Sequence, residues 1–377
     1  MRAARTIFNN FNSLLPASTS SYSVKATEVV KSTPYPRRIL SGIQPTGSLH
    51  LGNFLGAVQK WVELQNSGED AFYSIADLHA ITVPQDPKVL QNGIFEMTAS
   101  LLACGIDPEK CVLFQQSKVQ YHTQLCWVLA SLTTMAKLGQ QAQLREKRNI
   151  IQELSTALYL YPVLQAADIL LYKATLVPVG EDQISHLNLA SFLAKTFNKR
   201  FGNTFPEPQA FINEDSSRRL KSLRNPLSKM SKSDKDPRSR INLFDSPEDI
   251  LLKCKKAVTD SISAVEYEPE KRPGISNLVV IHSSLTGRPI DTICQEVVGM
   301  QSGDYKIAMA NEIIEVLRPL RERFNQLINE PAYLENVLKV GALRAEAQAQ
   351  ETWQDVSRKI GIGRNQLAES DLATCKN

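Results

Sequence analysis

The feature that most constrains this chain is a turn rich in glycine and proline that joins an apolar segment to an amphipathic one. Residues 42–53 read Gly-Ile-Gln-Pro-Thr-Gly-Ser-Leu-His-Leu-Gly-Asn. Residues 38–42 have the composition of a short buried strand, and residues 52–65 carry a broad apolar helical face. A strand that turns directly into a helix is half of a βαβ unit, whose strands pair in parallel.

Strands and helices continue to alternate along the chain. Further strands are predicted at residues 71–77 and 111–115, separated by a helix at residues 88–104. A helix at residues 161–173 precedes another strand that closes at residues 177–180, and a new helix starts directly after it. This alternation predicts an α/β domain with a doubly wound parallel sheet of the Rossmann type.

The second half of the chain predicts a smaller helical domain. Residues 214–240 are dominated by Arg, Lys, Ser and Asp, which indicates a loop. The Ser-Pro pair at residues 246–247, followed by two acids, has the composition of a helix start. The pattern stays mostly helical to the C-terminus. We therefore expect a catalytic domain over residues 34–240 and a C-terminal α-helical domain over residues 241–377.

The first 33 residues differ from the rest in composition. They contain four basic residues and one acid, are rich in Ser, Thr and Asn, and place apolar side chains on one helical face. A basic, acid-poor and amphipathic start predicts a mitochondrial transit peptide, and hence a location in the mitochondrial matrix. A plain disordered tail is the alternative. Three of the four net positive charges lie here, so net charge gives no argument for nucleic-acid binding by the remaining chain.

The composition also argues against two kinds of site. The longest apolar stretch, residues 157–172, is interrupted by Gln165 and Asp168, so no membrane association is predicted. The six cysteines form no CxxC pair and show no zinc-binding spacing with histidine. We therefore predict no dedicated metal site.

The turn at residues 42–53 contains groups suited to a nucleotide. Gly42 and Gly47 let the backbone approach a ligand without a Cβ, and the helix N-terminus near Gly52 offers free N–H groups to negative charge. His50 can place a cation or a hydrogen-bond donor beside a phosphate. The turn follows the carboxyl end of a strand, where open α/β sheets bind ligands. An ordinary Gly/Pro turn is the alternative.

A second cluster lies about 180 residues further along the chain. Residues 229–233 read Lys-Met-Ser-Lys-Ser within the polar loop. Two lysines on a flexible loop can close on a triphosphate and follow the pyrophosphate as it leaves. A solvated basic surface loop is the alternative. Both segments together, in this order, indicate a site that brackets a nucleoside triphosphate.

Asp168 is the most informative single residue because it lies in an otherwise apolar helix. A buried carboxylate requires a partner, and a pocket for an indole requires one acceptor between apolar walls. A structural Asp that pairs with a lysine such as Lys173 is the alternative.

Polar groups also follow two of the predicted strands. Residues 180–183, Gly-Glu-Asp-Gln, suit sugar hydroxyls or a bound amino acid, although an acidic helix cap has the same composition. His79 either lines the same crevice or is structural. His122 and His282 carry no surrounding pattern.

On these segments the chain resembles the tryptophanyl-tRNA synthetases, in the bacterial and mitochondrial branch of this class I family. Residues 42–53 resemble the family's HIGH-type signature, with His50 at its first His position, and residues 229–233 are identical to its KMSKS signature. Residues 161–172 and 177–183 resemble the family's tryptophan-pocket and ribose segments. The resemblance implies the class I synthetase form of the Rossmann-like fold.

The resemblance also implies roles for individual residues. The implied catalytic residues are His50, Lys229 and Lys232. Those implied for tryptophan are Asp168, which would accept from the indole N–H, with Gly42, His79, Val177, Val179 and Gln183. Those implied for ATP are Gln44, Pro45, Thr46, Gly52, Asn53, Gly180, Glu181, Asp182, Leu220, Lys229, Met230, Ser231, Lys232 and Ser233.

The implied reaction has two steps. The carboxylate of L-tryptophan attacks the α-phosphate of ATP, and the 3′-terminal ribose of tRNA(Trp) then takes the tryptophanyl group. Mg²⁺ would be held mainly by the phosphates, because no carboxylate cluster forms a dedicated site. The resemblance implies a homodimer, and a helical domain that binds the tRNA anticodon.

Two other functions remain open at this point. A tyrosyl-tRNA synthetase shares the architecture, and a catalytically inert RNA-binding relative would retain the fold. The chain also departs from the family pattern at Leu40, at Gln165 and over residues 140–160.

Overall fold

The structure is a computed structural model that describes residues 34–140, 155–211, 220–232 and 234–363. The predicted transit segment, most of the connection over residues 140–160 and Ser233 lie outside the described residues. None of the described helices is long and apolar enough to cross a membrane.

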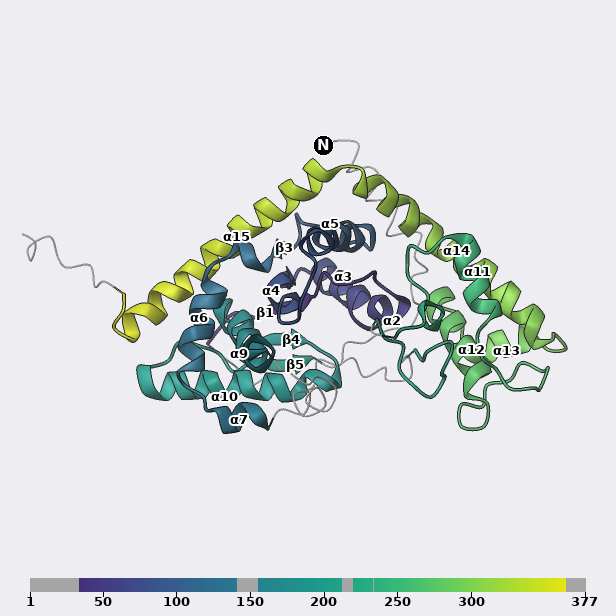
Figure 1. The fold of residues 1–377 in the computed structure, drawn as a ribbon, viewed down its shortest axis with the longest axis horizontal. Coiled ribbons are helices and arrows are strands. Elements are labelled where there is room, and N and C mark those ends of the chain that lie inside the picture. Colours follow the sequence, from purple (N-terminus) through teal and green to yellow (C-terminus); the bar gives the residue numbers. More distant parts are fainter. Residues whose placement is uncertain (1–33, 141–154, 212–219, 233, 364–377) are drawn as a thin grey trace, which may run out of the picture.

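A five-stranded parallel sheet lies at the centre of the molecule (Figure 1), as the alternating pattern predicts. Its strand order is β3-β2-β1-β4-β5, the doubly wound order. The strands are β1 (Arg38–Ile43), β2 (Asp70–Ile75), β3 (Val112–Gln115), β4 (Leu176–Pro178) and β5 (Gln209–Phe211). The chain therefore reverses its direction of winding between β1 and β4.

The helices that connect the strands pack on both faces of this sheet. Alternate residues of β1 point to opposite faces, so that Ile39 and Leu40 belong to two different apolar clusters. The helices of this half are α2 (Leu51–Asn53), a π-helical turn η1 (Phe54–Val58), α3 (Gln59–Asn66), α4 (Asp77–Ala80), α5 (Pro87–Ala103), α6 (Tyr121–Ala130), α7 (Met135–Gly139), α9 (Thr156–Leu171) and α10 (Ile184–Phe201). Short 3₁₀ turns are η2 (Gln116–Lys118), η3 (Glu181–Gln183) and η5 (Pro237–Ser239).

The start of α9 differs from the prediction. The helix begins at Thr156, five residues before the predicted start, because the Ser155 hydroxyl caps it by accepting a hydrogen bond from the Leu158 N–H at 3.1 Å. Pro162 therefore lies inside the helix rather than near its start. The helix predicted over residues 52–65 exists, but a π-helical turn divides it.

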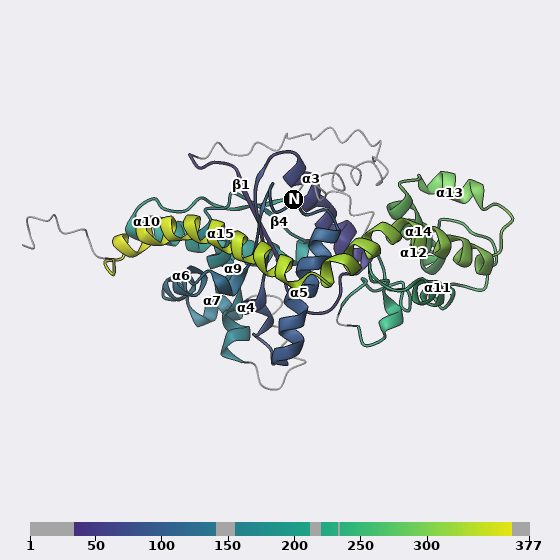
Figure 2. The same ribbon diagram turned by 90° about the horizontal axis from the view of Figure 1, so that it is seen from above.

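The second half is helical, as predicted. Its helices are α11 (Pro247–Lys255), α12 (Pro273–Thr286), α13 (Ile290–Glu296), α14 (Ser302–Ile328) and α15 (Pro331–Lys359). Ser246 caps α11 by accepting from the Asp249 N–H at 3.1 Å, which confirms the predicted helix start. Figures 1 and 2 show α11–α13 gathered at one end of the molecule, from which α14 runs back toward the middle and packs on α5.

The long helix α15 returns to the sheet. It starts where α14 ends, over the middle of the molecule, runs to the end opposite α11–α13 (Figures 1 and 2), and packs on β3. A Cβ on Gly341 would lie 1.8 Å from the Leu113 carbonyl oxygen, so only glycine permits this contact. Helix α15 was predicted to belong to the C-terminal helical domain, but it is part of the layer that covers the sheet of the first domain.

Candidate active site

Two of the segments predicted to bind ligands meet at the carboxyl edge of the sheet. Residues 42–53 leave β1 and residues 179–183 leave β4, and these two strands are neighbours. The Ser41 hydroxyl donates to the Pro178 carbonyl at 3.2 Å and joins the strand ends. This is the point where the winding reverses, where doubly wound sheets bind ligands.

The imidazole of His50 folds back over the first turn of α2. Its Nδ1 accepts from the Asn53 N–H at 3.3 Å, while the His50 N–H donates to Asn53 Oδ1 at 3.5 Å. A Cβ on Gly52 would lie 3.0 Å from His50 Nδ1, so glycine leaves room for the ring. Gly47 has a φ of 65°, which explains a glycine in this turn.

Two of the backbone N–H groups predicted to be free are occupied. The Leu51 N–H donates to the Ile241 carbonyl at 3.0 Å, and the Asn53 N–H bonds to His50. The Leu243 N–H donates to the Leu49 carbonyl at 2.9 Å, so residues 241–243 form an antiparallel bridge with the signature turn. An anion at this turn would therefore be bound mainly by side chains rather than by free N–H groups of the helix.

The predicted loop with the two lysines packs against this turn. Met230 is 2% exposed, and its N–H donates to the carbonyl of the equally buried Leu220 at 3.0 Å. Lys232 Nζ donates to the Thr46 carbonyl at 3.2 Å. Thr46 and Lys232, which lie 186 residues apart in the sequence, are thus in direct contact. The interpretation as a fully solvated surface loop is wrong for Met230 and Lys232.

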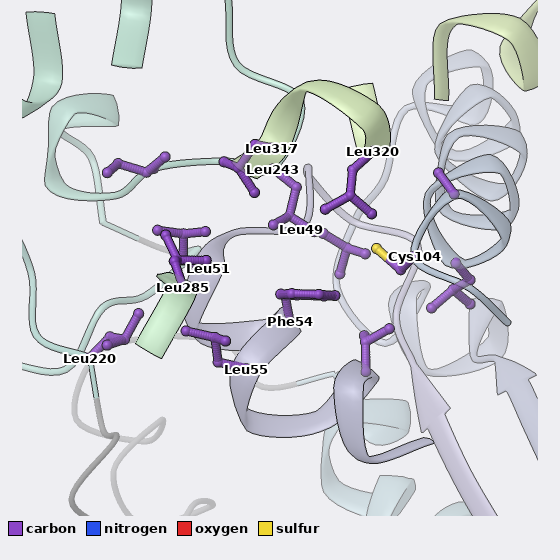
Figure 3. Close-up of a cluster of buried hydrophobic side chains, with 14 of the residues drawn as sticks. Leu49, Leu51, Phe54, Leu55, Cys104, Leu220, Leu243, Leu285, Leu317 and Leu320 are labelled. Atoms are coloured by element: carbon purple, nitrogen blue, oxygen red, sulfur yellow. The ribbon is translucent and has the colours of Figure 1, made fainter. Parts of the chain in front are cut away.

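An apolar cluster holds the signature turn and the lysine loop together. Figure 3 shows Leu49 and Leu51, which flank His50, among side chains from the loop and from the helical end. The labelled members from those other segments are Leu220, Leu243, Leu285, Leu317 and Leu320. The signature turn and helices α12 and α14 therefore share one core.

Positive charge concentrates around His50. We call His50, Lys229, Lys232 and Arg240 the cation cluster. Burial, together with the charges of Lys232, Arg240 and Lys229, lowers the pKa of His50 to about 4. Burial and the charge of Arg240 lower the pKa of Lys232 to about 8. Arg240, which donates to the Asp234 carbonyl at 3.1 Å, was not among the predicted site residues.

The cation cluster has no acidic partner within the described part of the chain. No Asp or Glu of that part forms an ion pair with Lys229, Lys232 or Arg240. Because His50 Nδ1 accepts a hydrogen bond and the ring is neutral, its proton lies on Nε2. Of the two roles predicted for His50, the structure favours the donor over the cation.

Asp168 lies at the centre of a second buried cluster. Its Oδ1 accepts from Gln116 Nε2 at 2.7 Å and lies 2.6 Å from His122 Nδ1, and its Oδ2 lies 2.7 Å from His79 Nε2. His122 Nε2 lies 2.9 Å from the Tyr172 hydroxyl. We call these five residues the Asp168 cluster. The predicted lysine partner, Lys173, is not part of it.

The Asp168 cluster keeps its carboxylate ionised. Burial alone would raise the pKa of Asp168, but the charge of His79 and hydrogen bonds from His122 and His79 hold it well below its ordinary value. Tyr172 is fully buried, and its hydroxyl lies 2.9 Å from His122 Nε2. Because an ionised carboxylate can only accept, His122 Nδ1 donates to Asp168. His122, which showed no pattern in the sequence, therefore orients the carboxylate.

A chain of hydrogen bonds connects the segment after β4 to helices α9 and α10. Gln183 Oε1 accepts from His186 Nδ1 at 2.9 Å, and His186 Nε2 lies 3.1 Å from the Tyr161 hydroxyl. Gln183 Nε2 donates to Asp182 Oδ2 at 2.6 Å. A Cβ on Gly180 would lie 2.8 Å from Asp182 Oδ1, so the exposed Asp182 carboxylate lies directly against this turn.

The structure places the other predicted residues around these clusters. Val177 is buried, and Val179 packs on the same apolar cluster. Gln44 is exposed, and the Pro45 carbonyl lies so near Gly93 that a Cβ there would come within 2.3 Å. Gly42 is exposed, and a Cβ there would make only an ordinary contact, 3.4 Å from the Ser74 carbonyl oxygen. Ser231 is half-buried, and Glu181 begins η3.

No group of three or more His, Cys, Asp or Glu side chains in the described residues is arranged to hold a metal ion. The prediction that Mg²⁺ is held by phosphates stays a prediction. The donors of the cation cluster are described groups that could contact a phosphate.

Comparison with known proteins identifies the family. Residues 33–318 match the family described as tRNA synthetases class I (W and Y). The chain is 47% identical to a tryptophan–tRNA ligase of Corynebacterium glutamicum over 328 residues, which cover 86% of this chain and 94% of that protein. It is 44% identical to the tryptophan–tRNA ligase of Caldanaerobacter subterraneus over 326 residues, 86% of this chain and 98% of that protein.

Solved structures agree with this relationship. The tryptophanyl-tRNA synthetase of Campylobacter jejuni, complexed with ADP and tryptophan, superposes with a TM-score of 0.77 at 32% identity, over 86% of this chain and 99% of that one. A tyrosyl-tRNA synthetase of Pyrococcus horikoshii gives 0.62 at 22% identity, over 79% of this chain and 90% of that one, and shares the fold. The family match, the identities and the joined signature segments lead to one conclusion: the chain belongs to the class I aminoacyl-tRNA synthetases, among the tryptophan–tRNA ligases.

Proposed function

We propose that this chain activates L-tryptophan with ATP at the β1–β4 edge of its sheet and transfers the product to tRNA(Trp). The observation that carries the proposal is the contact between Lys232 Nζ and the Thr46 carbonyl, which brings both nucleotide signatures together. A buried, ionised acceptor, Asp168, lies at the same edge of the sheet. The ligand set of the Campylobacter jejuni structure, ADP and tryptophan, supports the same substrates.

In the first step, a carboxylate oxygen of tryptophan forms a bond to the α-phosphorus of ATP. The bond between that phosphorus and the bridging oxygen breaks, and pyrophosphate leaves with the electron pair. Lys232 and Arg240 stabilise the negative charge that grows on the leaving group, and neutral His50 donates from Nε2. In the second step, a ribose hydroxyl of tRNA attacks the acyl carbon and AMP leaves. No covalent enzyme intermediate is required, because both steps depend on positioning and charge.

Asp168 selects the amino acid in this proposal. The indole N–H donates to its Oδ2, which has one hydrogen-bond partner, His79, against two on Oδ1. Gly42, Val177, Val179 and Gln183 are assigned to the walls of the amino-acid site. Mg²⁺ enters with ATP and would be held by the phosphates.

The test is amino-acid-dependent exchange between ATP and labelled pyrophosphate, run with each of the twenty amino acids. We expect exchange with tryptophan alone. Exchange with tyrosine in place of tryptophan would indicate a tyrosyl-tRNA synthetase, and no exchange with any amino acid would indicate an inert relative.

We assign the enzyme to the mitochondrial matrix because residues 1–33 have the composition of a transit peptide. The family match, which begins at residue 33, leaves these residues outside the shared enzyme. Residues 1–33 should route a fluorescent reporter to mitochondria, and replacing Arg2 and Arg5 with Glu should abolish the routing. A reporter with the native segment that stays in the cytosol would contradict the assignment.

We also propose that the enzyme is a homodimer. We further propose that the helical residues 241–377 bind the anticodon of tRNA(Trp). Two large apolar side chains support a partner surface on neighbouring helices: Trp127 of α6 is 79% exposed and Met135 of α7 is 66% exposed. Both helices pack on α9. Light scattering should give twice the chain mass, and Trp127→Glu should halve it. A native monomer would refute the dimer.

A further inference from the structure

A buried ion pair lies directly behind the signature turn, outside both signatures. Lys253 Nζ of α11 lies 2.5 Å from Asp245 Oδ2, and the two side chains are 9% and 12% exposed. A buried pair of this kind costs desolvation energy and is weak evidence for stability alone. Its position relative to His50 gives it a different use.

The carboxylate of Asp245 fixes one residue, Asn242, at two points. Oδ2 accepts from the Asn242 N–H at 2.7 Å, and Oδ1 accepts from Asn242 Nδ2 at 3.0 Å. Asn242 in turn forms an antiparallel bridge with His50. The carboxylate is therefore separated from the His50 backbone by a single residue.

The bonds on either side of Asn242 complete a clamp on the turn. The Ile241 carbonyl accepts from the Leu51 N–H at 3.0 Å, and the Leu243 N–H donates to the Leu49 carbonyl at 2.9 Å. These two bonds flank His50. A shift of residues 241–243 would therefore move His50 and the start of α2.

The helical end of the molecule holds Asp245 from two helices. Lys253 belongs to α11, and Arg321 Nη1 of α14 donates to the Asp245 carbonyl at 3.3 Å. Helices α11 and α14 pack on each other, and both contribute to the core that contains Leu49 and Leu51. The placement of these helices is thereby linked to the placement of His50.

We propose that the Asp245–Lys253 ion pair is a positioning element for amino-acid activation, which holds Asn242 so that His50 stays aligned with the nucleotide. The inference rests on the proposed function, because alignment matters only if ATP reacts at this turn. Neither residue needs to touch the substrate. A misplacement of about 1 Å at a reacting group can lower a rate on the order of 10²-fold.

The test uses the double variant Asp245→Leu/Lys253→Met, which replaces the pair with apolar groups. Such replacements of buried pairs are often neutral for stability, whereas Lys253→Met alone leaves an uncompensated carboxylate. We expect the double variant to fold, with a lower melting temperature than the wild type, because Asn242 loses two hydrogen-bond acceptors. We expect kcat for tryptophan-dependent pyrophosphate exchange to fall at least about tenfold, with little change in the KM for tryptophan.

Amide hydrogen exchange provides a readout that does not depend on activity. In the double variant, the Leu51 and Leu243 amides should exchange faster than in the wild type, because their bonds form the clamp. If the wild-type chain does not activate tryptophan, the proposed function fails, whereas the exchange of these two amides still tests the clamp.

Two further variants make the test specific. Arg272→Met is the control, because Arg272 is a buried residue of the same helical part that pairs with Asp260 and does not contact residues 241–245. It should lower stability and leave kcat and both amides unchanged. Asn242→Ala leaves the ion pair in place and should show the same changes in kcat and amide exchange as the double variant, but smaller ones. This variant replaces the double variant in the test if the latter does not fold.

The results separate cleanly. Lower kcat together with faster exchange at Leu51 and Leu243 supports the inference. Wild-type kcat in the double variant and in Asn242→Ala overturns it. A lower kcat with unchanged exchange at both amides also overturns it, because the effect would then not pass through the clamp.

Discussion

The Asp168 cluster and the cation cluster both lie at the carboxyl edge of the sheet. Neighbouring groups compensate the charge of the first cluster but not that of the second. The carboxylate of Asp168 receives hydrogen bonds from Gln116, His122 and His79, which come from the ends of two other strands and from α6. In the cation cluster, positive charges face one another without a carboxylate in the described part of the chain.

The difference shows in the causes of the pKa shifts. The donors around Asp168 stabilise its charged form, so its pKa lies below the ordinary value. Burial, and then the neighbouring positive charges, oppose the charged forms of His50 and Lys232, so the pKa values of both bases are lowered. The tryptophan side is therefore complete before its ligand binds, whereas the nucleotide side is completed by the phosphates of ATP.

The largest expected effect comes from removing the compensated carboxylate. Sites that hydrogen-bond a substrate group reject analogues that lack it by roughly 10⁴–10⁵. Asp168→Ala should raise the KM for tryptophan sharply and remove most of the discrimination against phenylalanine, with little change in the KM for ATP. Asp168→Asn should be milder, since its amide oxygen can still accept.

Asp77→Ala is the matched control for this change. Asp77 is a buried carboxylate at the same edge of the sheet, but it binds Gln115 and Ser117 rather than the histidines. Its loss should reduce stability without changing selectivity. Full tryptophan selectivity in a folded Asp168→Ala variant would show that α9 does not line the amino-acid site.

A smaller effect is expected on the nucleotide side. Removing one donor that stabilises developing charge typically costs about 2.7–4 kcal/mol, or roughly 10²–10³ in rate. Lys232→Ala should lower the rate of pyrophosphate exchange by this factor with little change in tryptophan binding. Lys235→Ala, which removes an exposed lysine three residues away, should have no such effect. Unchanged exchange in Lys232→Ala would mean that the loop has no role in activation.

The His122 side chain provides a sharper test of the compensated side. His122→Phe keeps a ring but removes one donor from Asp168, and a hydrogen bond to a charged group contributes about 1.5–3 kcal/mol. We expect the KM for tryptophan to rise about tenfold, and to rise further as the pH falls, because the pKa of Asp168 increases. Combining it with Tyr172→Phe removes the orphaned hydroxyl and should restore stability but not affinity. A pH-independent KM in both variants would restrict His122 to a structural role.

The last effect concerns folding stability rather than catalysis. The pKa of His50 is about 4 in the folded chain and about 6.5 when unfolded. The unfolded chain therefore binds the proton first as the pH falls, and folding stability decreases between about pH 6.5 and pH 4, by at most about 1.4 kcal/mol per pH unit. Above pH 6.5 this contribution is constant. Urea unfolding of His50→Asn should lack this part of the pH dependence; equal slopes in both proteins would contradict a buried neutral His50.

The sequence predicts the sheet and the two signatures because those signals are local. Alternating apolar segments and the Ser246 cap each depend on neighbouring residues, and both are confirmed. The contacts of His122 and Arg240 could not be predicted in this way. Each becomes part of a cluster only when strands and helices distant in sequence come together, and periodicity contains no information about such pairs.

The same reason explains the two corrections at the signature turn. The N–H groups near Gly52 read as free because a helix start leaves them unpaired within its own segment. The partner of the Leu51 N–H is the Ile241 carbonyl, 190 positions away, whereas the Asn53 N–H bonds to His50 within the turn itself. Met230 was predicted to lie in a polar loop from its neighbours, whereas its burial depends on packing against the helical end.

The most direct test of the difference between the clusters is proton uptake on binding, measured by calorimetry at pH 8.5 in buffers of different ionisation enthalpy. With a pKa of about 8, Lys232 is mostly uncharged at this pH in the free enzyme, and phosphates would restore its proton. ATP binding without tryptophan should then take up a measurable fraction of a proton, and Lys232→Met should abolish the uptake. Tryptophan binding should take up none. Equal uptake for both ligands, or none for ATP, would contradict a nucleotide side that is completed by its ligand.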